Sequence, residues 1–377
     1  MWIPLFLLAV SAPLEAQDPT WRKEVLLFWK QEQRDAAFGH MEKVFEARTV
    51  KAGGTVRAFG RGKPLVVGVD IDTYMRSQRS AGLLIVHKGA IRLEKYGLGH
   101  SAEGRWASFS VAKSATSLLV GAALQDGAIR SLDDKVTVYL AAMKGSAYDD
   151  VSLRQLLTMT SGVRWNEDYT DPRSDVAKFG ATNPEPGLDQ SLSYMRRLPR
   201  EAPAGSRWVY KTGETNLIGS LVSAAVGKPL SEYLSEKIWK PYGMERDAIW
   251  QVDLTGREVG GCCLAAALRD YARLGQFVLD GGVVRGRRVV AAGYLEQATS
   301  KQADIGAADR GYGYQWWTNA DGSFEARGIY GQAVFVDPKR ELVIAANSSW
   351  LQATDRDKMS PERAAFFKAV QAAVDRE

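Results

Sequence analysis

The order of apolar and polar residues predicts strands near both ends of the chain. Residues 82–87 and 90–96 surround a Lys-Gly turn, and the second segment alternates apolar and charged side chains, as expected for a β-hairpin. Near the other end, residues 324–328, 332–336 and 341–346 are short apolar runs separated by turn residues. These segments predict a second group of antiparallel strands.

The middle of the chain is predicted to be mostly helical. Residues 110–124 are nearly all small or apolar, which indicates a helix buried on every side. Apolar residues at helical spacing predict further helices at 20–48, 152–162, 213–226, 229–240, 265–280 and 361–375. Residues 163–207 are rich in proline and predict long loops, which in compact domains often carry function.

This arrangement predicts an α+β fold. The simplest assembly pairs the first hairpin with the last strands in one antiparallel sheet flanked by helices, with a mostly helical subdomain inserted. We expect residues 17–105 and 300–377 to form the sheet part and residues 106–299 the inserted helical part. A chain of 377 residues has room for one large domain or two modest ones, and we expect the two parts to form one.

The N-terminus predicts export. A short apolar run followed by small residues makes residues 1–16 a signal peptide, with cleavage expected after Ala16. The mature protein would then be periplasmic or secreted, and cytoplasmic if this segment is not a signal. The run is too short to cross a bilayer, and no other uncharged stretch approaches ~20 residues, so no membrane span is expected in the mature chain.

Composition narrows the function classes. The net charge is only +5, from 49 basic and 44 acidic residues, so nucleic acid is not an expected partner. The two cysteines, Cys262 and Cys263, are adjacent, and we expect two buried thiols because neighbouring cysteines bridge with difficulty. No spaced set of Cys and His predicts a metal site.

Ser110 and Lys113 are the first candidates for chemistry. They form Ser-x-x-Lys at the start of the apolar helix, where positions i and i+3 share a face. The helix N-terminus favours negative charge on the serine, and an apolar setting lowers the pKa of the lysine, so that it can accept the serine proton. The alternative is structural: Ser110 only caps the helix, and Lys113 extends to the solvent.

Other nucleophile designs have little support. The chain has no Gly-x-Ser-x-Gly elbow. A Ser-His-Asp triad would need His40, His87 or His100, and none of these histidines has a supporting motif.

Three motifs in order give the chain a family resemblance. Ser110-Val-Ala-Lys113 is followed by Tyr210-Lys-Thr212 and then by Ala326-Arg-Gly328. This series resembles the serine β-lactamases of class C, the penicillin-binding proteins and related esterases. Residues 165–175 and 328–332 are most similar to the 6-aminohexanoate-dimer (nylon-oligomer) hydrolase and esterase branch.

The resemblance implies one catalytic β-lactamase-related domain and an acyl-enzyme mechanism. Ser110 would be the nucleophile, activated by Lys113 and Tyr210, and the backbone N–H groups of Ser110 and Ile329 would form the oxyanion hole. The substrate-binding residues implied are Tyr169, Trp165, Thr212 and Gly328. For Trp165 and Tyr169, plain packing is the alternative. No metal or cofactor is implied.

Two departures from the family pattern bear on the substrate. Thr212 stands where the family has Asn, and Ala326 stands where it has a lysine that holds a substrate carboxylate. Arg327 is expected to point away, because neighbouring strand residues face opposite sides. We therefore expect a small-molecule ester or amide as substrate. The alternatives are a β-lactamase or D-alanyl-D-alanine peptidase, and a non-catalytic penicillin-binding-like sensor. The sequence does not predict an oligomeric state.

Overall fold

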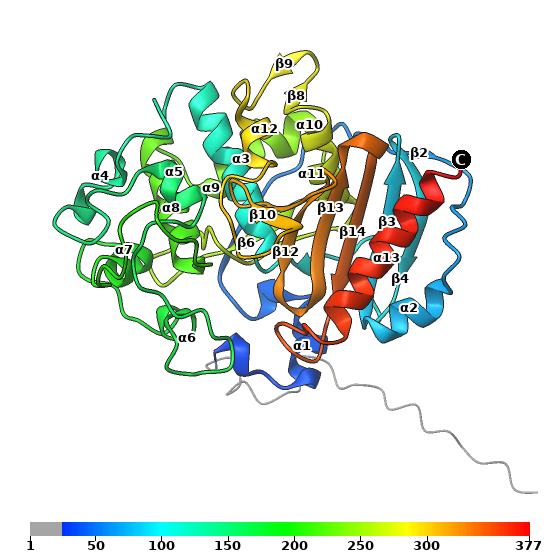
Figure 1. The fold of residues 1–377 in the computed structure, drawn as a ribbon, viewed down its shortest axis with the longest axis horizontal. Helices are drawn as coiled ribbons and strands as arrows, with labels where there is room; N and C mark the ends of the chain where they lie inside the picture. Colours follow the sequence, from blue (N-terminus) through cyan, green and yellow to red (C-terminus); the bar gives the residue numbers. More distant parts are fainter. Residues whose placement is uncertain (1–24) are drawn as a thin grey trace, which may run out of the picture.

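An eight-stranded sheet forms the centre of the computed structural model, which describes residues 25–377 (Figure 1). The strand order is β10-β11-β12-β13-β14-β3-β4-β2, and every pair is antiparallel except β2 with β4. The strands are β2 (Gly60–Arg61), β3 (Ser80–His87), β4 (Ala90–Tyr96), β10 (Arg310–Tyr312), β11 (Trp317–Asn319), β12 (Phe324–Gly328), β13 (Gln332–Asp337) and β14 (Leu342–Ser348). The pairing of β3 with β14 confirms that the first hairpin and the last strands form one sheet, as predicted for an α+β fold.

Alternate side chains along the strands face opposite sides of the sheet, and each side packs against an apolar layer. Leu83 and Ile85 of β3 face the layer that contains the C-terminal helix α13 (Met359–Val374). Leu84 and Val86 face the larger core on the other side. The helix α2 (Ile71–Ser77) also packs on β3, and α13 lies across the sheet in Figure 1.

The larger core contains the helix predicted to be buried on every side. This helix, α3 (Val111–Gln125), packs against α8 (Thr212–Val226) and against β12, and α11 (Leu268–Leu279) packs on β3, β13 and β14. The remaining helices here are α4 (Val136–Tyr139), α5 (Leu153–Leu157), α6 (Asp175–Phe179), α7 (Gln190–Met195), α9 (Leu230–Leu234), α10 (Lys240–Tyr242) and α12 (Tyr294–Ala298). Figure 1 shows most of them grouped beside the sheet.

The N-terminal segment differs from the prediction of one long helix over 20–48. Its described part holds only α1 (Gln31–Ala37), two 3-10 turns and the strand β1 (Ala47–Val50). Trp29 and Phe38 are buried on either side of α1, in a separate apolar cluster, so the apolar spacing reflects packing of turns rather than a continuous helix.

A second, smaller sheet was not predicted. It has the order β1-β6-β7-β5, with β5 (Trp106–Ala107), β6 (Ala248–Gln251) and β7 (Leu264–Ala266). Its strands are two to four residues long and come from distant parts of the chain, so no periodicity marks them. This sheet matters because β5 leads directly into α3.

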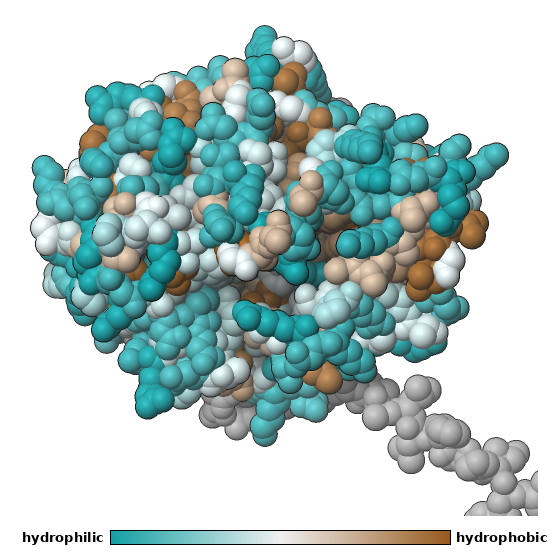
Figure 2. Space-filling model, viewed as in Figure 1, coloured by the Kyte–Doolittle hydropathy of each residue, from teal (hydrophilic) through white to brown (hydrophobic). Residues whose placement is uncertain are grey.

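The expected signal peptide, residues 1–16, lies outside the described residues. Between residues 25 and 377, none of the helices combines the length and the apolar character needed to cross a bilayer. On the face drawn in Figure 2, polar side chains cover most of the surface and apolar ones form small separate groups.

Candidate active site

The junction between β5 and α3 holds Ser110 in a constrained position. Phe109, directly before it, is buried and has a φ of 45°, in the left-handed region that bulky residues rarely adopt. Ser110 itself makes no side-chain cap to the helix. Unusual backbone conformations of this kind are maintained by their surroundings and cluster at functional sites.

Lys113 is buried at this junction and faces three oxygen atoms. Its Nζ lies 3.0 Å from Ser110 Oγ, 3.0 Å from Thr212 Oγ1 and 2.6 Å from the Gly261 carbonyl oxygen. The residue is only 1% exposed, so it does not extend to the solvent. Burial lowers the pKa of Lys113 to about 8, although the nearby Glu167 acts in the opposite direction. A lysine with this pKa can act as a base near neutral pH.

Tyr210 completes a group of three side chains around the serine. Its ring centroid lies 5.2 Å from Lys113 Nζ. Burial, reinforced by Glu167, raises the pKa of Tyr210, whereas a hydrogen bond with the Ser110 side chain lowers it. The Ser110 hydroxyl therefore meets both an amine and a phenol.

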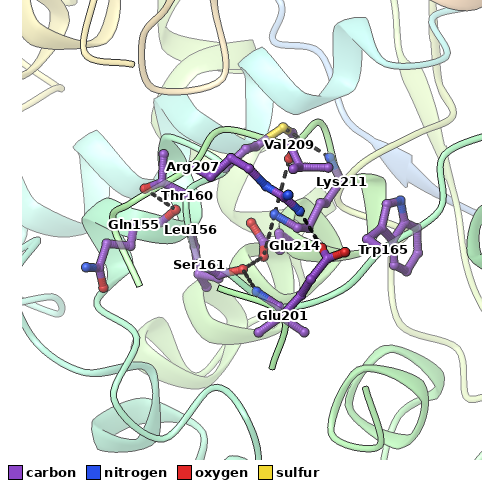
Figure 3. A network of polar contacts seen from close by, with 12 residues as sticks. Gln155, Leu156, Thr160, Ser161, Trp165, Glu201, Arg207, Val209, Lys211 and Glu214 are labelled. Carbon is purple, nitrogen blue, oxygen red and sulfur yellow. Dashed lines mark hydrogen bonds and ion pairs between the residues drawn. The ribbon is translucent and has the colours of Figure 1, made fainter. Parts of the chain in front are cut away.

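A buried ion pair supports the segment that carries Tyr210 (Figure 3). Lys211 Nζ lies 3.7 Å from Glu214 Oε1 and donates to the Val209 carbonyl at 3.3 Å. The Ser161 hydroxyl donates to the same Glu214 carboxylate, whose pKa is raised by burial. These contacts join the segment around Ser161 to the residues on either side of Tyr210.

An aromatic cluster borders Tyr210. Its ring stacks on Trp317 with centroids 5.5 Å apart, and Trp208 lies 5.8 Å from both Trp317 and Tyr312. The indole N–H of Trp208 is buried and has no hydrogen-bond partner among the described residues. The cluster gives the site one apolar wall with an unused donor.

Glu167 is a side chain of the site that the three motifs did not predict. Its carboxylate accepts hydrogen bonds from the indole of Trp165, the phenol of Tyr169 at 2.9 Å, and both the backbone N–H (2.9 Å) and the hydroxyl of Thr212. Trp165 and Tyr169 were predicted as site residues on either side of it. Its place in the sequence, between these two aromatic residues of the predicted site, was the signal that could have identified Glu167.

The end of β12 closes the site from the sheet side. Gly328 lies so close to Ser108 that an added Cβ would overlap the Ser108 carbonyl oxygen, which explains the need for glycine here. Ile329 follows, and then Tyr330, which has a φ of 59°. The structure therefore places the backbone at Ile329 beside the segment that contains Ser110.

The Ala326 position of the third motif brings no charge to this site. Ala326 is 1% exposed and packs in the larger core. Arg327 faces the other side of the strand, as predicted, where it pairs with Glu325 and lies 5.3 Å from the ring of Trp317.

The prediction of two free buried thiols is wrong. Cys262 and Cys263 form a disulfide with each other, and both are half-buried. Cys263 has a φ of 70°, and its N–H points to the Phe109 carbonyl at 3.4 Å. This left-handed turn, which the sequence does not reveal, accommodates a bridge between neighbours. The bridge directly follows Gly261, whose carbonyl accepts from Lys113.

The histidines lie elsewhere. His87 bonds to Arg92 in the sheet, and burial lowers the pKa of His100, beside Trp106, to about 4. Over residues 25–377, no group of three or more His, Cys, Asp or Glu side chains is arranged to hold a metal ion.

The fold and the three motifs define a class of protein, and comparison with known proteins supports it. Residues 70–367 match the family model described as "Beta-lactamase". The chain therefore belongs to the β-lactamase family, and it is a serine hydrolase of that family.

Three known proteins are similar to the chain in sequence or in fold. The chain is 29% identical over 297 residues to the 6-aminohexanoate-dimer hydrolase of Paenarthrobacter ureafaciens, covering 74% of this chain and 75% of the relative. Its fold is similar to that of a putative 6-aminohexanoate-dimer hydrolase from Bacillus anthracis, with a TM-score of 0.81, 23% identity, and 91% and 94% of the two chains covered. A family VIII carboxylesterase has a TM-score of 0.62 at 17% identity, covering 83% of this chain and 99% of that one.

Proposed function

We propose that the protein hydrolyses carboxylic esters or small amides through an acyl-enzyme on Ser110. The observation that carries this proposal is the buried amine of Lys113, 3.0 Å from the Ser110 hydroxyl. A buried amine whose pKa is lowered to about 8 is a competent general base, and a serine beside such a base is an activated nucleophile.

The reaction divides into two halves. Lys113, together with Tyr210, accepts the Ser110 proton, and the alkoxide attacks the carbonyl carbon of the substrate. The backbone N–H groups of Ser110 and Ile329 hold the oxyanion, a contact worth about 3 kcal/mol for each donor. The same pair returns the proton to the leaving alcohol or amine, and a water molecule activated by the pair then releases the acid.

The walls of the site favour substrates with apolar groups over those that carry a carboxylate. Ala326 supplies no cation, and Arg327 is paired with Glu325. The aromatic cluster around Tyr210 provides apolar surface for such groups. The names of two similar proteins, an aminohexanoate-dimer hydrolase and a carboxylesterase, agree with small amides and esters.

Covalent labelling tests the nucleophile. A fluorophosphonate probe should add to the wild-type protein once, as measured by intact mass, and Ser110→Ala should abolish the adduct. An adduct that persists in Ser110→Ala would assign the nucleophile elsewhere.

A substrate comparison tests the class. We expect turnover of p-nitrophenyl esters or small anilides well above that of a chromogenic cephalosporin. Rapid hydrolysis of the cephalosporin without hydrolysis of the ester would make the protein a β-lactamase instead. Absence of both labelling and turnover would favour a sensor.

A further inference from the structure

The Glu167 carboxylate is completely occupied by hydrogen-bond donors. Oε2 accepts from the Trp165 indole and the Thr212 N–H, and Oε1 accepts from the Tyr169 phenol and the Thr212 hydroxyl. An ionised carboxylate can only accept hydrogen bonds. The single hydrogen of the Thr212 hydroxyl is therefore directed at Glu167.

The orientation of the Thr212 hydroxyl hydrogen determines which hydrogen bond Thr212 can make with Lys113. With its own hydrogen on Glu167, Thr212 Oγ1 can only accept from Lys113 Nζ, 3.0 Å away. The Gly261 carbonyl, 2.6 Å from Nζ, is also only an acceptor. A neutral amine has two hydrogens, so these two acceptors use both of them. Its lone pair then faces the third neighbour, the Ser110 hydroxyl, at 3.0 Å.

We propose that Glu167 is a positioning residue that acts through Thr212. By taking the Thr212 hydrogen, it directs the lone pair of neutral Lys113 at Ser110, and its negative charge stabilises the ammonium that forms when the serine proton is transferred. This inference rests on the proposed function of Ser110 and Lys113. It also gives Thr212 a specific role: an Asn at this place could turn either its oxygen or its NH2 to the lysine, whereas Thr212 beside Glu167 can only accept.

Few other charges bear on Lys113. Within residues 25–377, Glu167, from the loop after α5, is the charged group that acts on the pKa of Lys113, and it raises that pKa against the effect of burial. Tyr210 presents its ring from the segment before α8, and Ser110 presents its hydroxyl from the start of α3. The buried Glu214 is paired with Lys211, the residue directly before its helix. Removal of the Glu167 charge should therefore lower the pKa of Lys113.

The Glu167→Gln variant removes the negative charge of the side chain and keeps its shape. The amide keeps the size of the side chain, but its NH2 group can donate to the Thr212 hydroxyl, which frees the Thr212 hydrogen to turn toward the lysine lone pair. Thr212→Ser keeps the hydroxyl and Thr212→Val removes it. Asp168→Asn is the matched control, because it removes one negative charge from the neighbouring exposed side chain, which bonds only locally to Thr170.

The readout is the rate of fluorophosphonate labelling of Ser110 between pH 6 and 10, in the full protein. Labelling needs no known substrate, so an error in the substrate class leaves the test intact. For Glu167→Gln we expect a high-pH rate reduced about tenfold or more and a midpoint shifted down by about half a pH unit or more. Thr212→Val should reduce the rate similarly, Thr212→Ser should recover most of that loss because it keeps the hydroxyl, and Asp168→Asn should keep both rate and midpoint.

Three results would overturn the inference. A lower rate for Glu167→Gln with an unmoved midpoint would make Glu167 a structural residue only. A midpoint that rises would mean that the Glu167 charge does not raise the pKa of Lys113. A wild-type protein that is not labelled at all would overturn the proposed function, and this inference with it, whereas the first two results leave the function of Ser110 standing.

Discussion

The rings of Phe109 and Tyr330 pack edge to face, with centroids 5.3 Å apart, although most of the chain separates the two residues. Both have positive φ angles, and both also contact Phe38. Phe109 directly precedes Ser110, and Tyr330 directly follows Ile329. The contact therefore joins the two backbone segments whose N–H groups we expect to hold the oxyanion.

Replacing Tyr330 tests this connection. Tyr330→Leu removes the ring contact, so the two N–H groups lose their mutual alignment. We expect kcat to fall about tenfold or more with KM nearly unchanged, because these groups act on the transition state. Tyr330→Phe keeps the ring and loses the hydroxyl, with its hydrogen bond of 3.2 Å to Leu27 and its contact with Arg34, so it should remain active. Equal loss in both variants would contradict the assignment to the ring.

The pH profile of the wild-type protein should follow Lys113. The neutral amine is the active form, and its pKa is about 8. We therefore expect kcat/KM to rise about tenfold per pH unit below pH 8 and to level off above it. Steady-state rates for a p-nitrophenyl ester across pH 6 to 9.5 measure this. A profile that levels off near pH 6 would indicate a different base.

The same lysine should affect stability in a pH-dependent way. Its pKa is about 8 in the folded protein and 10.5 as the ordinary value, so between these pH values the unfolded chain binds more protons. The free energy of unfolding should therefore rise with pH in this range by up to about 1.4 kcal/mol per unit.

Lys113→Met lacks this contribution. Urea unfolding of both proteins at pH 7.5, 8.5 and 9.5 should show the wild type gaining stability relative to the variant as the pH rises. Other titrating groups cancel in the comparison. A difference that stays constant over these pH values would mean that Lys113 keeps its ordinary pKa when folded.

Tyr210→Phe should separate proton transfer from packing. The phenylalanine keeps the stacking contact with Trp317 but removes the hydroxyl that bonds with Ser110. We expect kcat to fall by about 10²- to 10⁴-fold, with little change in Tm. Activity close to that of the wild type would leave Lys113 as the only group that transfers the proton.

The sequence predicts the parts of the site that lie on regular elements. Ser110 and Lys113 stand one helical turn apart at the start of α3, a spacing that allows them to meet, and Tyr210 stands just before another predicted helix. The strands β3, β4, β12, β13 and β14 of the sheet were also predictable, because they are long enough to show alternation, whereas β2, β10 and β11 are only two or three residues long. These features depend on local periodicity.

The parts of the site and of the fold that the sequence does not predict depend on loop conformation. Glu167 reaches Thr212 only because the loop after α5 folds back over the start of α8, and no local pattern encodes that path. The bridge between Cys262 and Cys263 likewise accompanies a left-handed residue in a turn. The small sheet joins four segments too short to show any period.

The position of Glu167 has a consequence for how this enzyme can change. The side chain that tunes the base belongs to the same loop as Trp165 and Tyr169, two of the residues expected to meet the substrate. Selection or mutagenesis of this loop for a new acyl group would therefore also alter the working pH of the catalyst. Variants with broadened substrate range should be assayed at several pH values, since a substitution that admits a new substrate can make Lys113 a weaker base at the same time.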